Sequence, residues 1–262
     1  MQIIYQPLLN LIIVFYHLLF SNLGLAIIAF TVFMKLVLTP LTLPSMKMMQ
    51  KIKDHNPELE RIKKKYKDDK QKQLQAQTDF YKEKGINPAS GCLPQIINFV
   101  ILIALFNGFS TVFRTSDVTA SLNQILYPSL RISGEVNKYF LGQDLTRPDV
   151  IAVSVVPFPL PGLFLVFVAL LQFLSSKMML PEVKKLEKVA KATTEVSDDM
   201  AVSMQKQMIY MFPLITLVVG LSFPLSIVLF WGALSLFQGV QQYFVSGWGG
   251  LAPYVRRLKL SS

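Results

Sequence analysis

Residues 25–44 read LAIIAFTVFMKLVLTPLTLP, an apolar run that is long enough to cross a bilayer and carries one lysine, Lys35, near its middle. A lysine at the centre of a membrane span costs about 2.5–3.5 kcal/mol on insertion-based scales. The composition also indicates a membrane protein, since 52% of the 262 residues are apolar and 16% are charged, against about a quarter charged in soluble domains. The presence of Lys35 in this span therefore costs free energy, and the rest of the sequence must indicate why the residue is there.

Hydropathy predicts an all-α integral membrane protein with five core transmembrane segments. The expected segments are 22–44, 92–112, 151–177, 207–223 and 224–245. The last two come from one apolar run that is too long for a single span, and the stretch Phe223-Pro224-Leu225-Ser226 divides it.

The N-terminal apolar stretch has two interpretations. Its polar residues fall on one side of a helix and are Gln6, Pro7, Asn10 and His17. Such a stripe is typical of a helix that lies in the membrane interface, and we favour this interpretation for residues 1–21. The stretch could instead cross the bilayer and pair with the first core segment through the turn Ser21-Asn22-Leu23-Gly24.

Basic residues are concentrated in alternate connecting segments. Residues 45–91 hold 12 Lys and Arg, 177–207 hold six, those after 245 hold three, and 113–150 hold four. The positive-inside rule then places 45–91, the loop 178–206 and the short basic tail 246–262 in the cytoplasm, with 113–150 outside the cytoplasm. In this arrangement Lys35 is the only formal charge in the interior of a predicted span, since Lys177 is the last residue of the span 151–177.

The segment 45–91 is predicted to form a cytoplasmic helical hairpin. Its first helix starts at Asn56 as the N-cap with Pro57 at the first helical position, and its second helix, 70–84, ends at Gly85. The residues that could join the two helices are few: Leu59, Ile62 and Tyr66 on the first helix, and Leu74, Thr78 and Tyr81 on the second. The densest basic cluster is Lys63, Lys64, Lys65 and Lys67. The hairpin could be a solvated charged surface, a surface held near anionic headgroups, or a contact for ribosomal RNA or a targeting factor.

Polar residues inside the spans are the candidate functional residues. Besides Lys35 they are Gln95, Asn98, Gln172, Ser235, Gln238, Gln241 and Gln242. Such residues often form hydrogen bonds between helices. We prefer this interpretation for Gln241 and Gln242, which lie near a span end and could also reach headgroups. For Lys35 this explanation is weaker, because no span contains Asp or Glu. A water-filled cavity open to the cytoplasm would solvate its charge.

The sequence offers little to hold a metal or a cofactor. Cys92 is the only cysteine, which excludes an internal disulfide and a multi-cysteine metal site. His17 and His55 stand alone, without the spacing of metal ligands. We therefore expect no cofactor, no metal and no covalent chemistry.

Several stretches together resemble one family. They are KLVLTPLT at 35–42, NPELERIKKKYKDDKQ at 56–71, KGINPASGCLPQ at 84–95 and FPLSIVLFWGALSLFQGVQQYF at 223–244. In this order they are similar to the YidC/oxidase-assembly/Albino family of membrane protein insertases, and the resemblance covers about residues 7–250. Lys35 falls where that family usually has arginine, so the positive charge is kept and the bidentate guanidinium is not.

The resemblance implies a five-span core around a hydrophilic groove that is open to the cytoplasm and to lipid. It places Lys35, Asn98, Gln172 and Trp231 at the groove, and the polar positions Gln95, Ser235 and Gln238 are expected to join them. It also implies a protein of the bacterial plasma membrane that inserts membrane proteins and helps them fold. Nascent membrane proteins would be its substrates, and it would act alone or with the Sec translocon, the ribosome and the signal recognition machinery.

Two other classes of function are open from the residues alone. A small-solute transporter or channel would normally show internal repeats or several ionisable groups inside the spans, and neither is visible in the sequence. An intramembrane hydrolase with Lys35 as its base would need a serine beside it, and the nearest serines in sequence, Ser21 and Ser45, lie towards the ends of the span.

Overall fold

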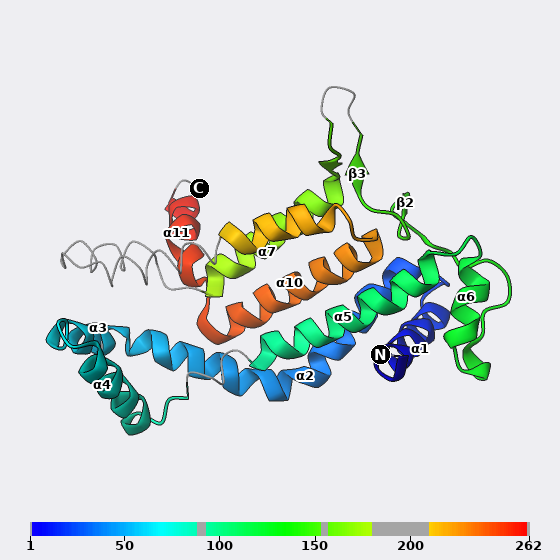
Figure 1. The fold of residues 1–262 in the computed structure, drawn as a ribbon. Coiled ribbons are helices and arrows are strands. Elements are labelled where there is room, and N and C mark those ends of the chain that lie inside the picture. Colours follow the sequence, from blue (N-terminus) through cyan, green and yellow to red (C-terminus); the bar gives the residue numbers. More distant parts are fainter. Residues whose placement is uncertain (1, 88–92, 153–156, 180–209, 261–262) are drawn as a thin grey trace.

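The computed structural model describes residues 2–87, 93–152, 157–179 and 210–260. The chain is built from helices, and its strands are two residues long (Figure 1). The α-helices are α1 (Gln2–Leu18), α2 (Leu23–Asp54), α3 (Asn56–Lys65), α4 (Lys70–Glu83), α5 (Leu93–Phe113), α6 (Val118–Ile125), α7 (Leu163–Met179), Tyr210–Gly220, α10 (Leu225–Ser246) and α11 (Ala252–Leu260). Cys92 lies outside the described residues. So does the predicted loop 178–206 from residue 180 onward.

Three described helices are long and apolar enough to cross a membrane, and they lie at Leu23–Ile52, Ile96–Phe113 and Leu225–Ser246. Shorter apolar helices lie at Gln2–Leu18, Leu163–Met178 and Tyr210–Gly220. The prediction of an all-α integral membrane protein is therefore confirmed. The number of spans, five, stays a prediction.

Two helices have bounds that differ from those expected. α2 does not end near residue 44 but continues to Asp54, with Pro40 and Pro44 inside it. At about 1.5 Å per residue its 32 residues are about 48 Å long, well beyond a hydrocarbon core of about 30 Å. α7 begins at Leu163 rather than at 151, because Val150–Ile151 (β3) pairs with Leu160–Pro161 (β4) in a short hairpin.

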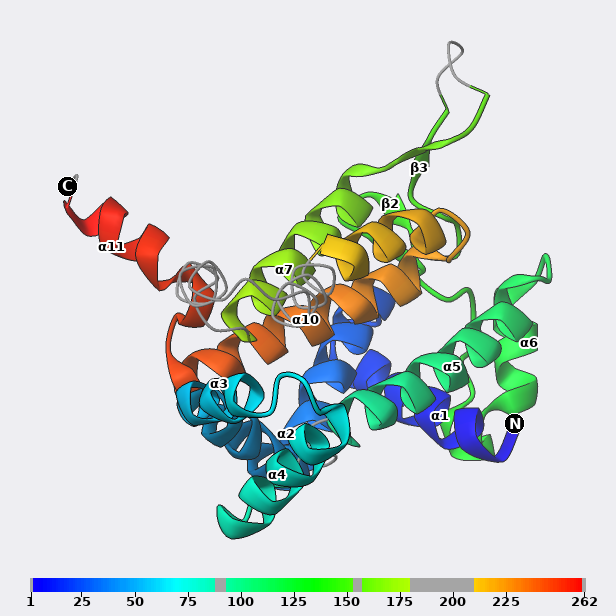
Figure 2. The same ribbon diagram turned by 60° about the vertical axis from the view of Figure 1, so that its left-hand side comes forward.

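The polar stripe of α1 contacts protein. Asn10 is 3% exposed, its Oδ1 accepts from Tyr127 N at 2.8 Å, and its Nδ2 donates to Gln6 O. Gln6 Nε2 donates to Ile125 O at 2.8 Å. The apolar side of the same helix is buried against α2 and α5. The polar groups that suggested an interfacial helix thus hold α1 to the segment between α5 and α7, where α6 and α1 lie side by side (Figure 2).

The segment between α5 and α7 is ordered by local polar contacts. Its strands β1 (Tyr139–Phe140) and β2 (Gln143–Asp144) form a hairpin, and η2 (Pro128–Leu130) follows α6. Asp144 accepts from Thr146 N at 2.9 Å and from Thr146 Oγ1 at 2.6 Å, and Lys138 Nζ lies 3.4 Å away. Burial raises the pKa of Asp144, but the hydrogen bonds from Thr146 and the charge of Lys138 outweigh it, so the pKa lies below its usual value. Asp144 stays ionised and holds this turn.

The helical hairpin that was expected after α2 is formed by α3 and α4. The N-cap residue of α3 is His55 rather than Asn56, so Pro57 lies in the first turn as the second helical residue and not, as predicted, the first. Asp69 caps α4, and hydrogen bonds from Lys72 N and then Lys72 Nζ lower the pKa of Asp69. Gly85, at φ +61°, directly follows the C-cap residue of α4.

The small core of this hairpin uses one residue that the pattern missed. Phe80 is 8% exposed and its ring lies edge-on to His55 at 5.9 Å between centroids. Leu59 and Ile86 are also buried, whereas Leu74 is 67% exposed. The prediction that Leu74 joins the two helices is therefore wrong, because it lies on the outer side of α4.

Small residues allow α7 and α10 to pack closely. A Cβ on Gly232 would lie 2.7 Å from Val168 Cγ2, and one on Gly239 would lie 2.9 Å from Ser175 Oγ. Ser175 Oγ donates to Ser235 O at 2.8 Å between the same two helices. In lipid, where apolar surface alone does not hold helices together, such close contact is a main source of packing energy.

We expect Gly232→Leu to destabilise the protein by about 1–3 kcal/mol, because the added side chain must push Val168 away from α10. Thermal unfolding in detergent, followed by circular dichroism, measures this change. Leu236→Phe is the control, since it adds volume on the 55% exposed side of the same helix. Equal unfolding midpoints for Gly232→Leu and Leu236→Phe would contradict the packing argument.

Candidate functional site in the membrane-spanning helices

Lys35 lies on a polar face of α2. Thr31, Lys35, Thr39 and Thr42 are spaced by four, four and three residues, which puts them on one side of a helix. Three of them are buried, with exposures of 1% for Thr31, 5% for Lys35 and 6% for Thr42. The neighbours Leu36 and Val37, on the other side of α2, are 58% and 55% exposed. α2 thus turns its polar face inward and its apolar face outward.

Lys35 has no acidic partner among the described residues, because the described spans contain no Asp or Glu. Its backbone oxygen accepts from Thr39 Oγ1 at 2.6 Å, which fixes the threonine side chain one turn further along α2. The ammonium group is therefore buried without a counter-ion from the described part of the protein. This is the feature that distinguishes Lys35 from the other polar residues of the spans.

α10 has a matching polar face. Trp231, Ser235, Gln238 and Gln242 are spaced by four, three and four residues. Ser235 and Gln242 are buried, and Trp231 and Gln238 are half-buried. On the other side of the helix, Leu236 and Val240 are exposed. Trp231, Ser235 and Gln238, which the sequence predicted for the groove, therefore share one inward face.

Two contacts between α2 and α10 lie on either side of Lys35. Towards the start of both helices, the rings of Phe30 and Phe230 are 6.5 Å apart between centroids. In the other direction, Gln241 Nε2 donates to Thr39 Oγ1 at 2.8 Å. The two contacts bring the helices together in parallel, and Lys35 lies between these two contact points along α2.

Gln241 and Gln242 both form hydrogen bonds within the protein. Gln241 bonds to Thr39 of α2, which is the expected kind of bond between helices, whereas Gln242 is 5% exposed and bonds to Ser246 Oγ of its own helix. The link between Thr39 and Gln241 was not predicted. The spacing of Thr31, Lys35 and Thr39 along one face was visible in the sequence and could have suggested Thr39.

The remaining predicted groove residues lie on α5 and α7. Asn98 is 7% exposed and begins the buried face of α5 that continues with Leu105 and Phe109. Gln172 Oε1 accepts from Thr216 Oγ1, so it joins α7 to the helix Tyr210–Gly220. The side chain of Gln95 is outside the described part of the structure. Lys35, Asn98 and the α10 residues thus lie on inward faces, whereas Gln172 is engaged by a neighbouring helix.

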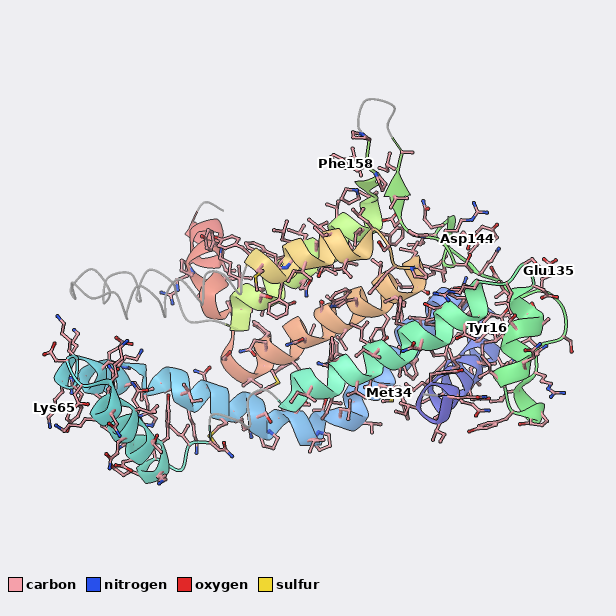
Figure 3. All side chains as sticks on the ribbon, in the orientation of Figure 1. Tyr16, Met34, Lys65, Glu135, Asp144 and Phe158 are labelled. Atoms are coloured by element: carbon pink, nitrogen blue, oxygen red, sulfur yellow. The ribbon has the colours of Figure 1, made fainter. Side chains whose placement is uncertain are left out.

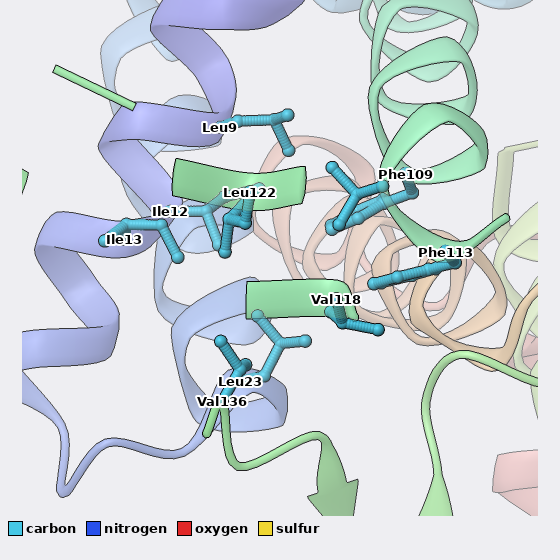
Figure 4. A pocket seen from close by; sticks show the side chains of 10 residues that line it. Leu9, Ile12, Ile13, Leu23, Phe109, Phe113, Val118, Leu122 and Val136 are labelled. Atoms are coloured by element: carbon cyan, nitrogen blue, oxygen red, sulfur yellow. The ribbon is translucent and has the colours of Figure 1, made fainter. Parts of the chain in front are cut away.

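A small cavity lies elsewhere in the protein, between α1, α2, α5 and α6 (Figure 4). Its lining is apolar: Leu9, Ile12, Ile13, Leu23, Phe109, Val112, Phe113, Val118, Leu122 and Val136. None of the predicted groove residues lines it, so it packs the helix ends and does not represent a polar site.

The predicted basic cluster lies on α3 and just after it. Lys63 Nζ pairs with Glu60 Oε1 at 3.0 Å, while Lys64 and Lys65 are exposed (Figure 3). Lys67, in the turn before α4, is exposed too. At least two ammonium groups, those of Lys64 and Lys65, are thus presented to solvent next to each other.

Over most of its length the chain is similar in sequence to one protein family and to several named bacterial proteins. Residues 14–249 match the family described as 60Kd inner membrane protein. A "Membrane protein insertase YidC" from Fusobacterium nucleatum is 32% identical over 225 residues, 86% of each chain. Proteins of the same name from Rickettsia akari and Prosthecochloris aestuarii are 28% and 31% identical over 86% of this chain. This chain spans 36% and 33% of the length of these two relatives.

We expect Thr39→Val and Gln241→Leu to be non-additive in stability, because each removes the same hydrogen bond. The coupling free energy should be about 0.6 kcal/mol, the average for such bonds in membranes, and at most about 1.7 kcal/mol. A double-mutant cycle of unfolding in detergent measures it. The control cycle pairs Thr31→Val with Gln241→Leu, since Thr31 Oγ1 donates to Ile27 O of its own helix. Equal coupling in both cycles would rule out the contact.

Proposed function

Because the chain belongs to the 60Kd inner membrane protein family, we propose that it inserts membrane proteins into the bilayer through a hydrophilic groove lined by α2, α5 and α10. The observation that carries this proposal is the buried ammonium of Lys35, which no described carboxylate neutralises. Such a group needs water around it, and it attracts an acidic segment that enters from the water. The proposed activity includes no covalent step, cofactor or metal.

The polar faces of α2 and α10 would lower the barrier to crossing. A hydrophilic segment that enters lipid loses hydrogen bonds to water without replacement. In the groove, Lys35 offers a charge, and Trp231, Ser235 and Gln238 offer hydrogen-bonding groups part of the way across. One positive charge without a fixed counter-ion attracts the segment but does not trap it in a buried ion pair. The segment can therefore leave the groove again.

The apolar part of the substrate would follow a different path. The outward faces of α2 and α10 expose large apolar side chains, among them Leu36, Val37, Leu236 and Val240. A nascent transmembrane segment can lie against these faces and pass sideways into lipid while its hydrophilic end occupies the groove. During insertion the hydrophilic part of the substrate then stays among polar groups, and its apolar part stays among apolar side chains and lipid.

The orientation and the partners are part of the proposal. We place α3, α4 and the C-terminus in the cytoplasm of a bacterium, since basic residues prevail there. The substrates are nascent membrane proteins, taken over alone or together with the Sec translocon. The exposed lysines of α3 would meet anionic headgroups, the ribosome or the signal recognition machinery.

We expect Lys35→Arg to retain insertion and Lys35→Ala to reduce it. A charge attraction of about 1–4 kcal/mol corresponds to a loss of roughly fivefold or more for a substrate with an acidic translocated tail. The measurement is insertion efficiency in reconstituted vesicles with paired substrates, one acidic and one in which Asn and Gln replace the acids. The defect of Lys35→Ala should be confined largely to the acidic substrate. If wild type and Lys35→Ala insert that substrate equally well, the electrostatic mechanism fails.

We expect the hairpin of α3 and α4 to be required for insertion but not for folding of the membrane helices. Replacing residues 57–84 by a short Gly/Ser linker should leave the detergent-solubilised protein monodisperse and lower insertion several-fold. The matched variant keeps the hairpin and changes Lys63, Lys64, Lys65 and Lys67 to Gln. A similar loss in both variants assigns the effect to charge. Full insertion by the linker variant would refute a role for the hairpin.

A further inference from the structure

The hairpin of β3 and β4 stands apart from the helices. Val150 pairs with Pro161 and Ile151 with Leu160 in antiparallel register. The two strands project from the bundle in both views of the fold (Figures 1 and 2). They leave it where α7 and α10 begin, at Leu163 and Leu225.

The base of this hairpin is fixed to both helices. Asp149 bridges the strands and α7, because its backbone oxygen accepts from Gly162 N at 2.8 Å and its Oδ2 accepts from Leu165 N at 2.8 Å. On the α10 side, Leu225 N donates to Arg147 O at 2.8 Å, and Pro148 forms a bridge with Pro224. The direction of the hairpin is thus set by the starts of two helices.

The described part of the hairpin is apolar and uncovered. Ile151 and Phe158 are 52% and 59% exposed, Val150 is 39% exposed, and residues 150–152 and 157–161 include no charge. Phe158 lies on the projecting part, away from the helices (Figure 3). The apolar surface continues onto the outward face of α7, where Leu163 is 80% exposed. A connected apolar surface of this kind marks a site of interaction.

The open edge of β4 argues against an added strand on that side of the hairpin. The hydrogen bond from Gly162 to Asp149 makes the next pair, Val150 with Pro161, a pair whose N–H and C=O positions point outward. Pro161, and by the two-residue period Pro159, therefore stand where β4 would present N–H groups, and proline has none. Such an edge is a poor template for an added strand. On the β4 side the described hairpin therefore presents no N–H donor at Pro159 or Pro161 that lipid would leave unsatisfied.

We propose that the β3–β4 hairpin is an interfacial anchor that lies in phospholipid, at the boundary between headgroups and acyl chains, at the end of the bundle where α7 and α10 begin. Its exposed Ile151 and Phe158 enter the apolar side of that boundary. The anchor fixes the start of α7 relative to the membrane surface, because Asp149 ties the hairpin to the first turn of α7.

The test measures where a side chain of the hairpin lies in a pure lipid membrane. In a Cys92→Ser background, Phe158→Cys carries a spin label, and the full chain is reconstituted in vesicles of phosphatidylethanolamine and phosphatidylglycerol. Collisions with oxygen, which concentrates in lipid, are compared with collisions with a water-soluble nickel chelate. Phe167→Cys on the 55% exposed face of α7 is the lipid reference, and the exposed Ser133→Cys is the water reference.

We expect the label at 158 to resemble that at 167, with a ratio of oxygen to nickel collisions several-fold above that at 133. Ile151→Cys, on the paired strand, repeats the measurement should Phe158→Cys fail to fold. A ratio equal to that at 133 would place the hairpin in water and overturn the proposal. Broadening of the spectrum as the ratio of protein to lipid rises would overturn it as well, since a second copy would then cover the hairpin.

Discussion

A lysine in a span without acids imposes the arrangement of the helices around it. Polar groups in a bilayer must be satisfied by protein or by water, and the described spans supply no carboxylate for Lys35. α2 responds by turning its face of Thr31, Lys35 and Thr39 inward, and α10 meets it with a polar face of its own. The contact of Phe30 with Phe230 on one side and of Thr39 with Gln241 on the other keeps the helices parallel around the charge.

Much of the fold could be predicted from the sequence, and the failures share one cause. The bounds of α5 and α10 and the two helices of the hairpin followed from apolar length, Pro57 and Gly85. The start of α7 did not, because hydropathy records whether residues suit lipid and not whether they form a helix. Residues 150–161 are as apolar as a span, and the pairing of β3 with β4 is a contact that no local pattern reveals. The same limit hid the extension of α2 through Pro40 and Pro44.

The candidate site was predictable in its residue types and less so in its partners. Lys35 stood out because a lysine in a membrane span costs free energy. The polar faces of α2 and α10 follow from helical spacing alone. The bond between Thr39 and Gln241 joins residues 202 positions apart, and the bond between Gln172 and Thr216 joins two different helices. Such pairs depend on how helices are rotated against each other. For the same reason Phe80, rather than Leu74, became the core of the hairpin of α3 and α4.

The unbroken course of α2 has a mechanical consequence. From Lys35 to Asp54 the helix rises about 28 Å at 1.5 Å per residue, and α3 follows directly at Asn56. The C-terminal half of α2 therefore connects the membrane-spanning part of the helix directly to the basic hairpin. Pro40 and Pro44 each remove a backbone hydrogen bond within α2. The helix therefore bends most easily at these prolines, about one turn beyond Lys35. A displacement of the hairpin would be taken up at that point as a change of tilt of the residues after Pro40, and the polar face that holds Lys35 would keep its place.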